Sequence, residues 1–119
     1  MKYLLMTYGD ESAAANIPQE AMQEVMAEYL AYTQDIQKSG VRLSGEALQP
    51  TATATTVRVR DGEKVTTHGP FAETKEQLGG YYLIECENLD EAIEWAAKCP
   101  AAKFGSVEVR PIMEFEQNW

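Results

Sequence analysis

Apolar residues recur along the chain with two different spacings, which predict its helices and strands. Residues 2–8 are largely apolar on both alternating faces, a pattern typical of a strand covered on both sides. Residues 9–17 have no regular period, which predicts a loop. Between Pro18 and Gly40, apolar side chains return every three or four residues and predict a long amphipathic helix. Its buried stripe comprises Met22, Val25, Met26, Tyr29, Tyr32, Thr33 and Ile36.

The middle of the chain alternates with the period of a strand. A weaker strand is predicted at 41–48, followed by an irregular connection. Residues 56–60 and 64–67 flank Asp61-Gly62, and an Asp-Gly step between two β-rich segments is a strong hairpin signal. The hairpin side chains expected to face inward are Val57 and Val59.

The last third predicts a strand, a short helix and a final strand. On the strand at 80–87, Tyr82 and Ile84 lie on the face opposite to that of Tyr81 and Leu83. A capping-box pattern begins a helix at Asn88, with Glu91 reaching back. The buried stripe of this helix comprises Leu89, Ala92, Ile93 and Ala96. The final strand, at 106–115, turns Val107 and Val109 inward and Glu108 and Arg110 outward.

This order of elements predicts a single α+β domain over residues 1–119, with two helices on one face of a mainly antiparallel sheet. The other face would be partly apolar, and so short a chain has no third layer to cover it. The apolar residues expected on that uncovered face are Tyr3, Leu5, Leu83 and Ile112. We therefore predict a homodimer in which two sheets pack face to face.

Composition and charge limit the kinds of molecule that the protein can be expected to bind. Nineteen acidic and ten basic residues give a formal net charge of −9, which opposes binding to a phosphate backbone, so we expect no direct nucleic-acid contact. No apolar run approaches the roughly 20 residues of a membrane span, and the chain start lacks a signal-peptide pattern. We expect a soluble, cytoplasmic protein in which Cys86 and Cys99 are small core residues rather than a disulfide framework.

The stretch from His68 to Glu76 concentrates the candidate chemistry. It combines the turn-forming Gly69-Pro70 with an aromatic ring, carboxylates, a hydroxyl and a cation. In one interpretation it forms a cleft with the sheet and binds a small polar or anionic ligand. In the other, Phe71 fills the core, the charges stay solvated and the tyrosines belong to the core. The candidate ligand-binding residues are Tyr8, Tyr29, Phe71, Glu73, Thr74, Lys75 and Tyr81.

His68 is the only histidine of the chain, so no metal site built on several histidines is available, and we predict neither a metal nor a cofactor. Histidine ordinarily titrates near pH ~6.5, which suits proton transfer, and His68 is the candidate catalytic residue. The alternative is a solvated turn histidine. Lys75 is interpreted either as a buried base or as a salt-bridged residue that holds the loop.

Seven stretches of the chain match one family pattern: 1–5, 8–11, 45–50, 53–58, 69–76, 78–85 and 99–102. With these, nearly the whole chain resembles the YCII-related, DGPF-domain family of small bacterial proteins. The resemblance implies a ferredoxin-like fold that pairs into a dimeric α/β barrel, and it implies no established activity. His68 stands where the family motif usually has aspartate. Wider relatives have been proposed to use a His–Asp dyad whose histidine position falls near Tyr29 here, so the resemblance implies that this dyad is missing.

Three classes of function follow. The first is a homodimer that binds a small ligand at the 68–76 loop. The second, by fold analogy, is a proton-transfer enzyme of the isomerase, lyase or dehydrohalogenase kind that uses His68. The third is an interaction module, because DGPF-type proteins often accompany extracytoplasmic-function sigma factors. The tail at Asn118-Trp119 is interpreted either as an anchor for such a regulatory partner or as a segment that swaps into the dimer mate.

Overall fold

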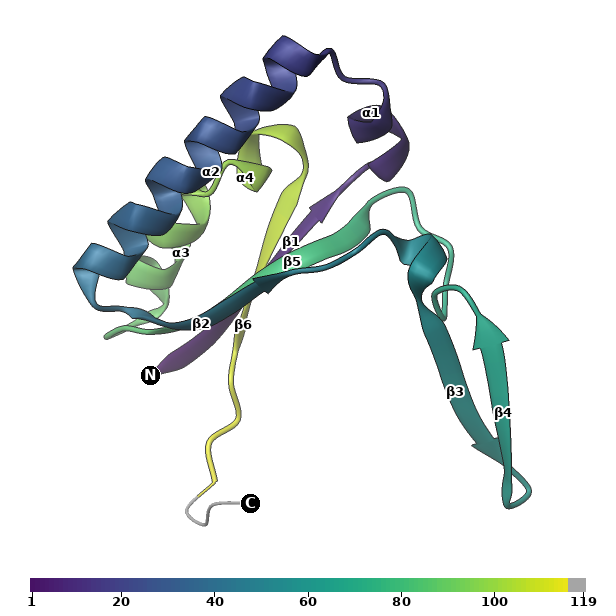
Figure 1. Cartoon of the computed structure of the whole chain (residues 1–119). Helices are drawn as coiled ribbons and strands as arrows, with labels where there is room; N and C mark the ends of the chain where they lie inside the picture. Colours follow the sequence, from purple (N-terminus) through teal and green to yellow (C-terminus); the bar gives the residue numbers. More distant parts are fainter. Residues whose placement is uncertain (116–119) are drawn as a thin grey trace.

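The computed structural model describes residues 1–115 and contains an α/β body and a hairpin that projects from it (Figure 1). The strands are β1 (Lys2–Gly9), β2 (Arg42–Ala47), β3 (Thr55–Arg60), β4 (Glu63–His68), β5 (Gln77–Glu85) and β6 (Ser106–Pro111). The helices are α1 (Glu11–Ala15), α2 (Gln19–Ser39), α3 (Leu89–Lys98) and α4 (Ala101–Phe104), with a 3-10 turn, η1, at Thr51–Thr53. Asn118-Trp119, the candidate anchor, lies outside the described residues.

The body is a four-stranded antiparallel sheet in the order β2-β5-β1-β6, and β3 and β4 form a separate two-stranded sheet. The long helix α2 and the shorter α3 lie on the same face of the four-stranded sheet (Figure 1). The predicted α+β fold with antiparallel sheets is therefore confirmed. Within residues 1–115, no helix is both long and apolar enough to cross a membrane.

The core lies between the sheet and the helices. Its most buried side chains come from β1, β5, α2 and the connection between α3 and α4: Tyr3, Leu5, Ile36, Ile84 and Cys99. The prediction that Tyr3 and Leu5 lie on the uncovered face was wrong, because both are buried beneath the helices. Strand β1 is apolar on both faces, so its alternation does not reveal which set the helices cover.

Helix α2 extends beyond the sheet at its N-terminal end (Figure 1). Tyr32 and Ile36 are buried as predicted, whereas Met22 and Met26 are exposed, the latter at 62%, which corrects their placement in the buried stripe. Twenty-one helical residues span about 31 Å. Because the N-terminal part of this length lies past the sheet, no strand within residues 1–115 covers Met22 and Met26 there. Gly40 ends the helix in the left-handed conformation, with φ of +81°.

The predicted loop at 9–17 contains the short helix α1, which the sequence pattern missed. The Asp10 carboxylate caps it by accepting hydrogen bonds from Ser12 and Ala13 backbone N–H groups and from the Ser12 hydroxyl. These hydrogen bonds, led by the Ser12 hydroxyl and with a smaller contribution from the positive charge of Lys75, lower the pKa of Asp10. A polar cap therefore supplies local order where hydrophobic periodicity gives no signal.

Helix α3 begins at the predicted cap. The Asn88 side-chain oxygen accepts the Glu91 N–H at 2.9 Å, and the Glu91 carboxylate accepts the N–H of Glu87 at 3.1 Å. Of its predicted stripe, the small residues Ala92 and Ala96 are buried, whereas Leu89 and Ile93 are 46% and 49% exposed. The helix thus presses its alanine face on the sheet and leaves its two larger apolar side chains at the rim.

The hairpin of β3 and β4 turns at Asp61-Gly62, as predicted, with positive φ angles of +52° and +77°. The prediction that Val57 and Val59 face inward was wrong. They are 57% and 62% exposed, since the hairpin projects away from the body and has no core to fill (Figure 1). Alternation identified the faces of this hairpin, but it carried no information on whether either face is covered.

The aromatic part of the core makes stability sensitive to alkaline pH. The Tyr32 ring meets Tyr82 edge-on at 5.4 Å between centroids, and its hydroxyl donates to the Trp95 carbonyl oxygen at 2.9 Å. Burial, with smaller effects of nearby Cys99 and Tyr82, raises the pKa of Tyr29 to about 12 from 10.0. Burial also raises the pKa of the Cys99 thiol.

Unfolding should therefore become easier above pH 10. The pKa of Tyr29 is higher folded than unfolded, so its contribution is fully present below about pH 10 and is lost as pH rises toward 12. Urea unfolding midpoints at pH 8 and pH 11 measure this effect, and Tyr29→Phe should show a smaller fall than wild type. If the urea midpoint fell equally in the two proteins, the pH dependence of stability would not come from Tyr29.

Candidate functional site

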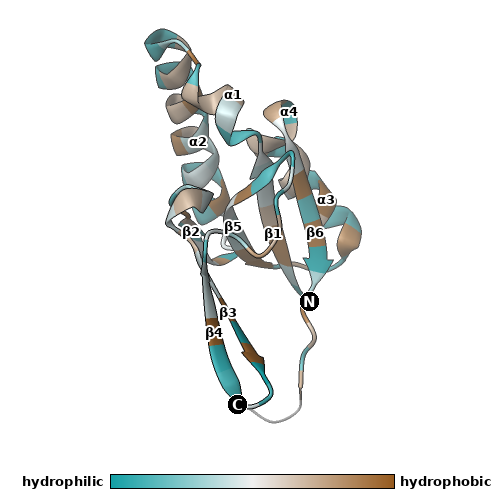
Figure 2. Cartoon of the chain, turned by 90° about the vertical axis from the view of Figure 1, so that its right-hand side faces the viewer, coloured by the Kyte–Doolittle hydropathy of each residue, from teal (hydrophilic) through white to brown (hydrophobic). Residues whose placement is uncertain are grey.

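The sheet face opposite the helices, called the open face below, is covered by no helix or strand of residues 1–115 in one copy. Figure 2 shows β2, β5, β1 and β6 side by side, with α2 and α3 behind them. Strand pairing places Met6 between Tyr81 and Glu108, and Leu4 between Leu83 and Arg110. All these except Arg110 are half-buried by their neighbours alone. The open face is thus an apolar floor edged by charged side chains.

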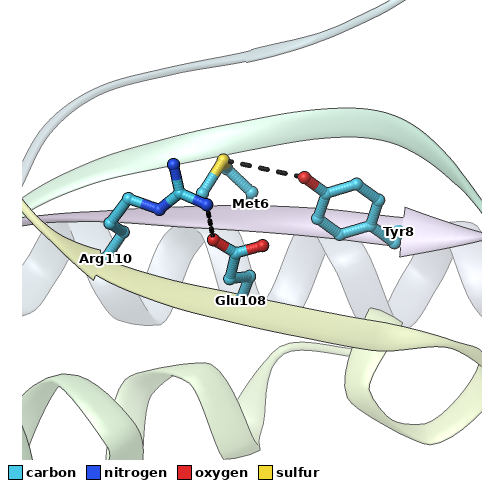
Figure 3. Close-up of polar contacts among 4 residues, drawn as sticks. All are labelled: Met6, Tyr8, Glu108 and Arg110. Carbon is cyan, nitrogen blue, oxygen red and sulfur yellow. Dashed lines mark hydrogen bonds and ion pairs between the residues drawn. The ribbon is translucent and has the colours of Figure 1, made fainter. Parts of the chain in front are cut away.

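Four side chains of the open face form a polar cluster (Figure 3). The Arg110 guanidinium forms an ion pair with the Glu108 carboxylate, and the Tyr8 hydroxyl donates to the Met6 sulfur at 3.8 Å. The charged side chains are 68% and 40% exposed, so water screens the pair and its contribution to stability is small. Sulfur is a weak acceptor, and the Tyr8 hydroxyl keeps capacity for a stronger partner. The cluster offers planar donors, a hydroxyl and a carboxylate on one surface.

The 68–76 loop begins where the hairpin ends. His68 closes β4 opposite Thr55 and is exposed. Gly69 is buried with φ of +102°, its N–H donates to the Ala54 carbonyl at 2.7 Å, and its carbonyl accepts the Thr56 hydroxyl at 2.8 Å. A residue with a Cβ rarely adopts this φ, so the glycine holds the base of the hairpin.

Phe71 does not fill the core. Its side chain is 78% exposed, which overturns the interpretation in which the ring plugs the interior. Glu73 and Lys75 are exposed as well. Within residues 1–115 the ion pairs are Lys103–Glu28 and Arg110–Glu108, so Lys75 does not form the predicted salt bridge. Because its side chain is exposed, Lys75 is not a buried base either.

The end of the loop is tied to the body next to the open face. The Glu76 carboxylate accepts the Ser106 hydroxyl at 2.8 Å, and Ser106 lies opposite Tyr8 in the sheet register. The Gln77 side chain accepts the Glu11 N–H at 2.9 Å, and the Thr74 hydroxyl donates to the Glu76 carbonyl at 2.5 Å. These contacts place the loop at the rim of the open face, beside Tyr8.

The structure brings together only some of the predicted ligand-binding residues. Tyr8 and Tyr81 share the open face. Phe71, Glu73, Thr74 and Lys75 lie on the loop that the Glu76–Ser106 hydrogen bond holds at the rim of this face. Tyr29 packs against the core on the helical side and cannot join them. Sequence reasoning did not include Met6, Glu108 or Arg110 in a site. The outward alternation of β6 was the only signal for Glu108 and Arg110, and Met6 had only its place on the same alternating set of β1 as Tyr8.

Two grooves lie on the helical side of the molecule. One, of about 660 Å³, runs between α2 and α3–α4, with Tyr32 and Cys99 at its base and lysines on its walls. The other, of about 560 Å³, lies along α3. Neither is lined by a residue of the 68–76 loop. In the described part of the chain, no three His, Cys, Asp or Glu side chains gather in a way that could hold a metal ion.

Comparisons with known proteins agree on the family and the fold. The model of the YCII-related domain matches residues 1–116. An uncharacterised protein of Rhizobium meliloti (strain 1021) is 40% identical over 114 residues, covering 94% of this chain and 92% of that protein. The 5-chloro-2-hydroxyhydroquinone dehydrochlorinase of Burkholderia phenoliruptrix AC1100, solved with 2,5-dihydroxybenzoquinone, shares the fold. It aligns with a TM-score of 0.54 and 16% identity over 98% of this chain and 97% of its own. The chain belongs to the family of YCII-related domains.

Proposed function

We propose that the protein is a homodimer that binds a small polar or anionic ligand between the open face and the 68–76 loop. The observation that carries this proposal is the pair Arg110–Glu108, set beside Tyr8 on an otherwise apolar and uncovered sheet. In one copy the ion pair is exposed to water and contributes little to stability. Enclosed by a second copy, the same groups would act in a medium of lower dielectric constant, where charge recognition is stronger.

The order of strands supports a ferredoxin-like arrangement. Strands β1 and β2, joined through α2, run parallel on either side of β5, and β5 and β6, joined through α3, run parallel on either side of β1. Two interleaved β-α-β units of this kind leave one sheet face without helices. Packing the open faces of two copies together, about 10 Å apart, would produce the dimeric α/β barrel that the resemblance implies.

The chemistry of the cluster favours a ligand with negative charge or planar oxygen atoms. The Arg110 guanidinium presents parallel N–H donors that match a carboxylate or enolate, and the Tyr8 hydroxyl adds a donor nearby. The Glu108 carboxylate would accept a hydroxyl of the ligand, while Leu4 and Leu83 provide an apolar floor. The 68–76 loop, held by Glu76, would cover the open end.

The dimer is tested by a single change on the open face. Met6→Glu places a carboxylate in the apolar floor, and we expect it to raise the dimer dissociation constant at least tenfold, as roughly 1.4 kcal/mol would. Met26→Glu on α2 makes the same change at a position that is 62% exposed and should leave association unchanged. Native mass spectrometry and sedimentation equilibrium measure both. A wild-type protein that stays monomeric would overturn the homodimer.

Ligand binding is tested with 2,5-dihydroxybenzoquinone, a planar, acidic probe with which the structural neighbour was solved. We expect binding in calorimetric titration, weakened at least tenfold in Arg110→Ala, since a charged hydrogen bond contributes about 1.5–3 kcal/mol. Lys98→Ala, which removes a cation on the helical side, is the control. Equal affinity in Arg110→Ala and wild type would remove Arg110 from the site. A retained small molecule in native spectra would identify a natural ligand.

A proton-transfer enzyme is the second candidate, and it rests on analogy with the shared fold. His68 is exposed at the end of β4, where the loop that would close the site begins. With a substrate in hand, His68→Asn should abolish turnover if His68 is the base, whereas an unchanged pH–rate profile would exclude it. A sigma-factor-linked partner stays a prediction from the family resemblance.

A further inference from the structure

The hairpin of residues 55–68, called the arm below, makes little use of its surface within one copy. Every residue of β4 is exposed, and Val57 and Val59 are 57% and 62% exposed. Figure 2 shows apolar bands on the arm among hydrophilic residues. An isolated two-stranded hairpin is marginally stable in water, and exposed apolar side chains on it indicate an interaction surface.

The register of the arm separates two unlike faces. Val57 lies opposite Thr66, and Val59 lies opposite Lys64, so these four side chains share the valine face. Arg58 lies opposite Val65 on the reverse face, which therefore carries only one valine. The valine face has the composition of a contact surface, with an adjacent apolar pair and one cation.

The charge of the arm is opposite to that of the body. Three of the ten basic residues and two of the nineteen acidic residues lie in the arm, so its net charge is +1 and that of the remaining chain is −10. The basic residues are Arg58, Arg60 and Lys64. The arm is therefore attracted to the acidic body of a second copy of this chain, and long-range attraction of this kind steers association.

The direction of the arm matches that partner. It projects on the side of the sheet that faces away from α2 and α3, the side of the open face (Figure 1). Six-residue strands span about 20 Å, whereas packed sheets lie about 10 Å apart. If a second copy packs its sheet on the open face, an arm of this length extends beyond that second sheet and lies along the side of the second copy.

We propose that each arm clasps the other copy of a homodimer, with the Val57–Val59 face packed against the partner's body. The inference rests on the homodimer of the proposed function and assigns it a second contact. By two-fold symmetry both arms are engaged, and the interface closes without extending into a filament. The arm ends at His68, where the 68–76 loop begins, and the Thr56 hydroxyl of the arm donates to the Gly69 carbonyl of the loop. Docking of the arm therefore also sets the position of that loop over the ligand site.

Substitutions on the two faces of the arm test the proposal. Val57→Asp combined with Val59→Asp should raise the dimer dissociation constant at least tenfold in sedimentation equilibrium. Val65→Asp, on the reverse face and 44% exposed, is the matched control and should stay within about twofold of wild type. Circular dichroism should show an intact body in each variant, since the arm lies outside the core. Val57→Thr with Val59→Thr, which keeps the β-branched shape, should weaken the dimer several-fold.

The outcomes separate the two proposals. A wild-type dimer that Met6→Glu dissociates but neither arm variant weakens would overturn the clasp and leave the sheet-to-sheet dimer standing. Equal weakening by Val65→Asp and by the aspartate pair would overturn the assignment of the valine face. A monomeric wild type would overturn both. Selective weakening by the valine-face variants, with 2,5-dihydroxybenzoquinone affinity reduced in parallel, would support both.

Discussion

Gly105→Ala should lower the free energy of unfolding by about 3 kcal/mol or more, because an added side chain would collide with backbone atoms. A Cβ at this position would lie 2.0 Å from the Tyr8 carbonyl oxygen and 3.0 Å from Gly9 Cα. Backbone atoms of a paired strand cannot move aside as the end of a flexible side chain can. The collision would push the start of β6 away from β1, and with it Glu108 and Arg110 away from Tyr8.

Urea denaturation followed by circular dichroism measures this effect. Gly9→Ala is the matched control, since nothing lies within 4 Å of a Cβ there and its φ is not positive. It should stay within about 1 kcal/mol of wild type. If Gly105→Ala were as stable as Gly9→Ala, the close approach of the α4–β6 turn to β1 would be contradicted. A folded variant with weakened ligand binding would instead show that this turn aligns the site.

Leu5→Ala should lower the free energy of unfolding by about 2–5 kcal/mol, the range for deleting a buried leucine side chain. Leu5 is fully buried at the centre of the sheet, opposite Tyr82 on one side and Val109 on the other. The shortened side chain leaves a cavity that two strands and the helices above cannot fill by collapse. The effect should not depend on protein concentration within the dimeric range.

Leu4→Ala makes the same deletion one residue earlier, on the open face. Its effect should be small in the monomer and should appear mainly as weaker association, so that apparent stability depends on protein concentration. Urea unfolding at several concentrations distinguishes the two variants. Equal and concentration-independent losses in both would show that Leu4 faces a finished interior, and this would contradict the uncovered face.

The position and type of most elements are written in local patterns. The 3.6-residue period of α2, the Asp61-Gly62 turn and the Asn88 cap each act within a few residues, so they could be predicted without knowledge of the rest of the chain. Alternation on β6 likewise placed Val107 inward and Glu108 outward. Helix α1 was missed, because a polar cap rather than a hydrophobic stripe defines it.

The site was predicted less well than the fold. The 68–76 loop was recognised from its composition, but the exposure of Phe71 was not predicted. An aromatic residue in a turn looks the same in the sequence whether its ring is buried or exposed. Tyr29 was grouped with Tyr8, although they lie on opposite sides of the sheet. Glu108 and Arg110 joined Met6 and Tyr8 only through the pairing of β1 with β6, two strands about a hundred residues apart in the chain.

The sequence by itself determined the α+β class, the long helix, the hairpin turn and the loop that carries most of the charged candidates. These depend on short-range periods, caps and turns. Tertiary structure decided which face of β1 the helices cover, which half of α2 is buried and whether the hairpin has anything to pack against. Such choices depend on contacts between distant segments, and an alternating pattern that is apolar on both faces is equally compatible with either side.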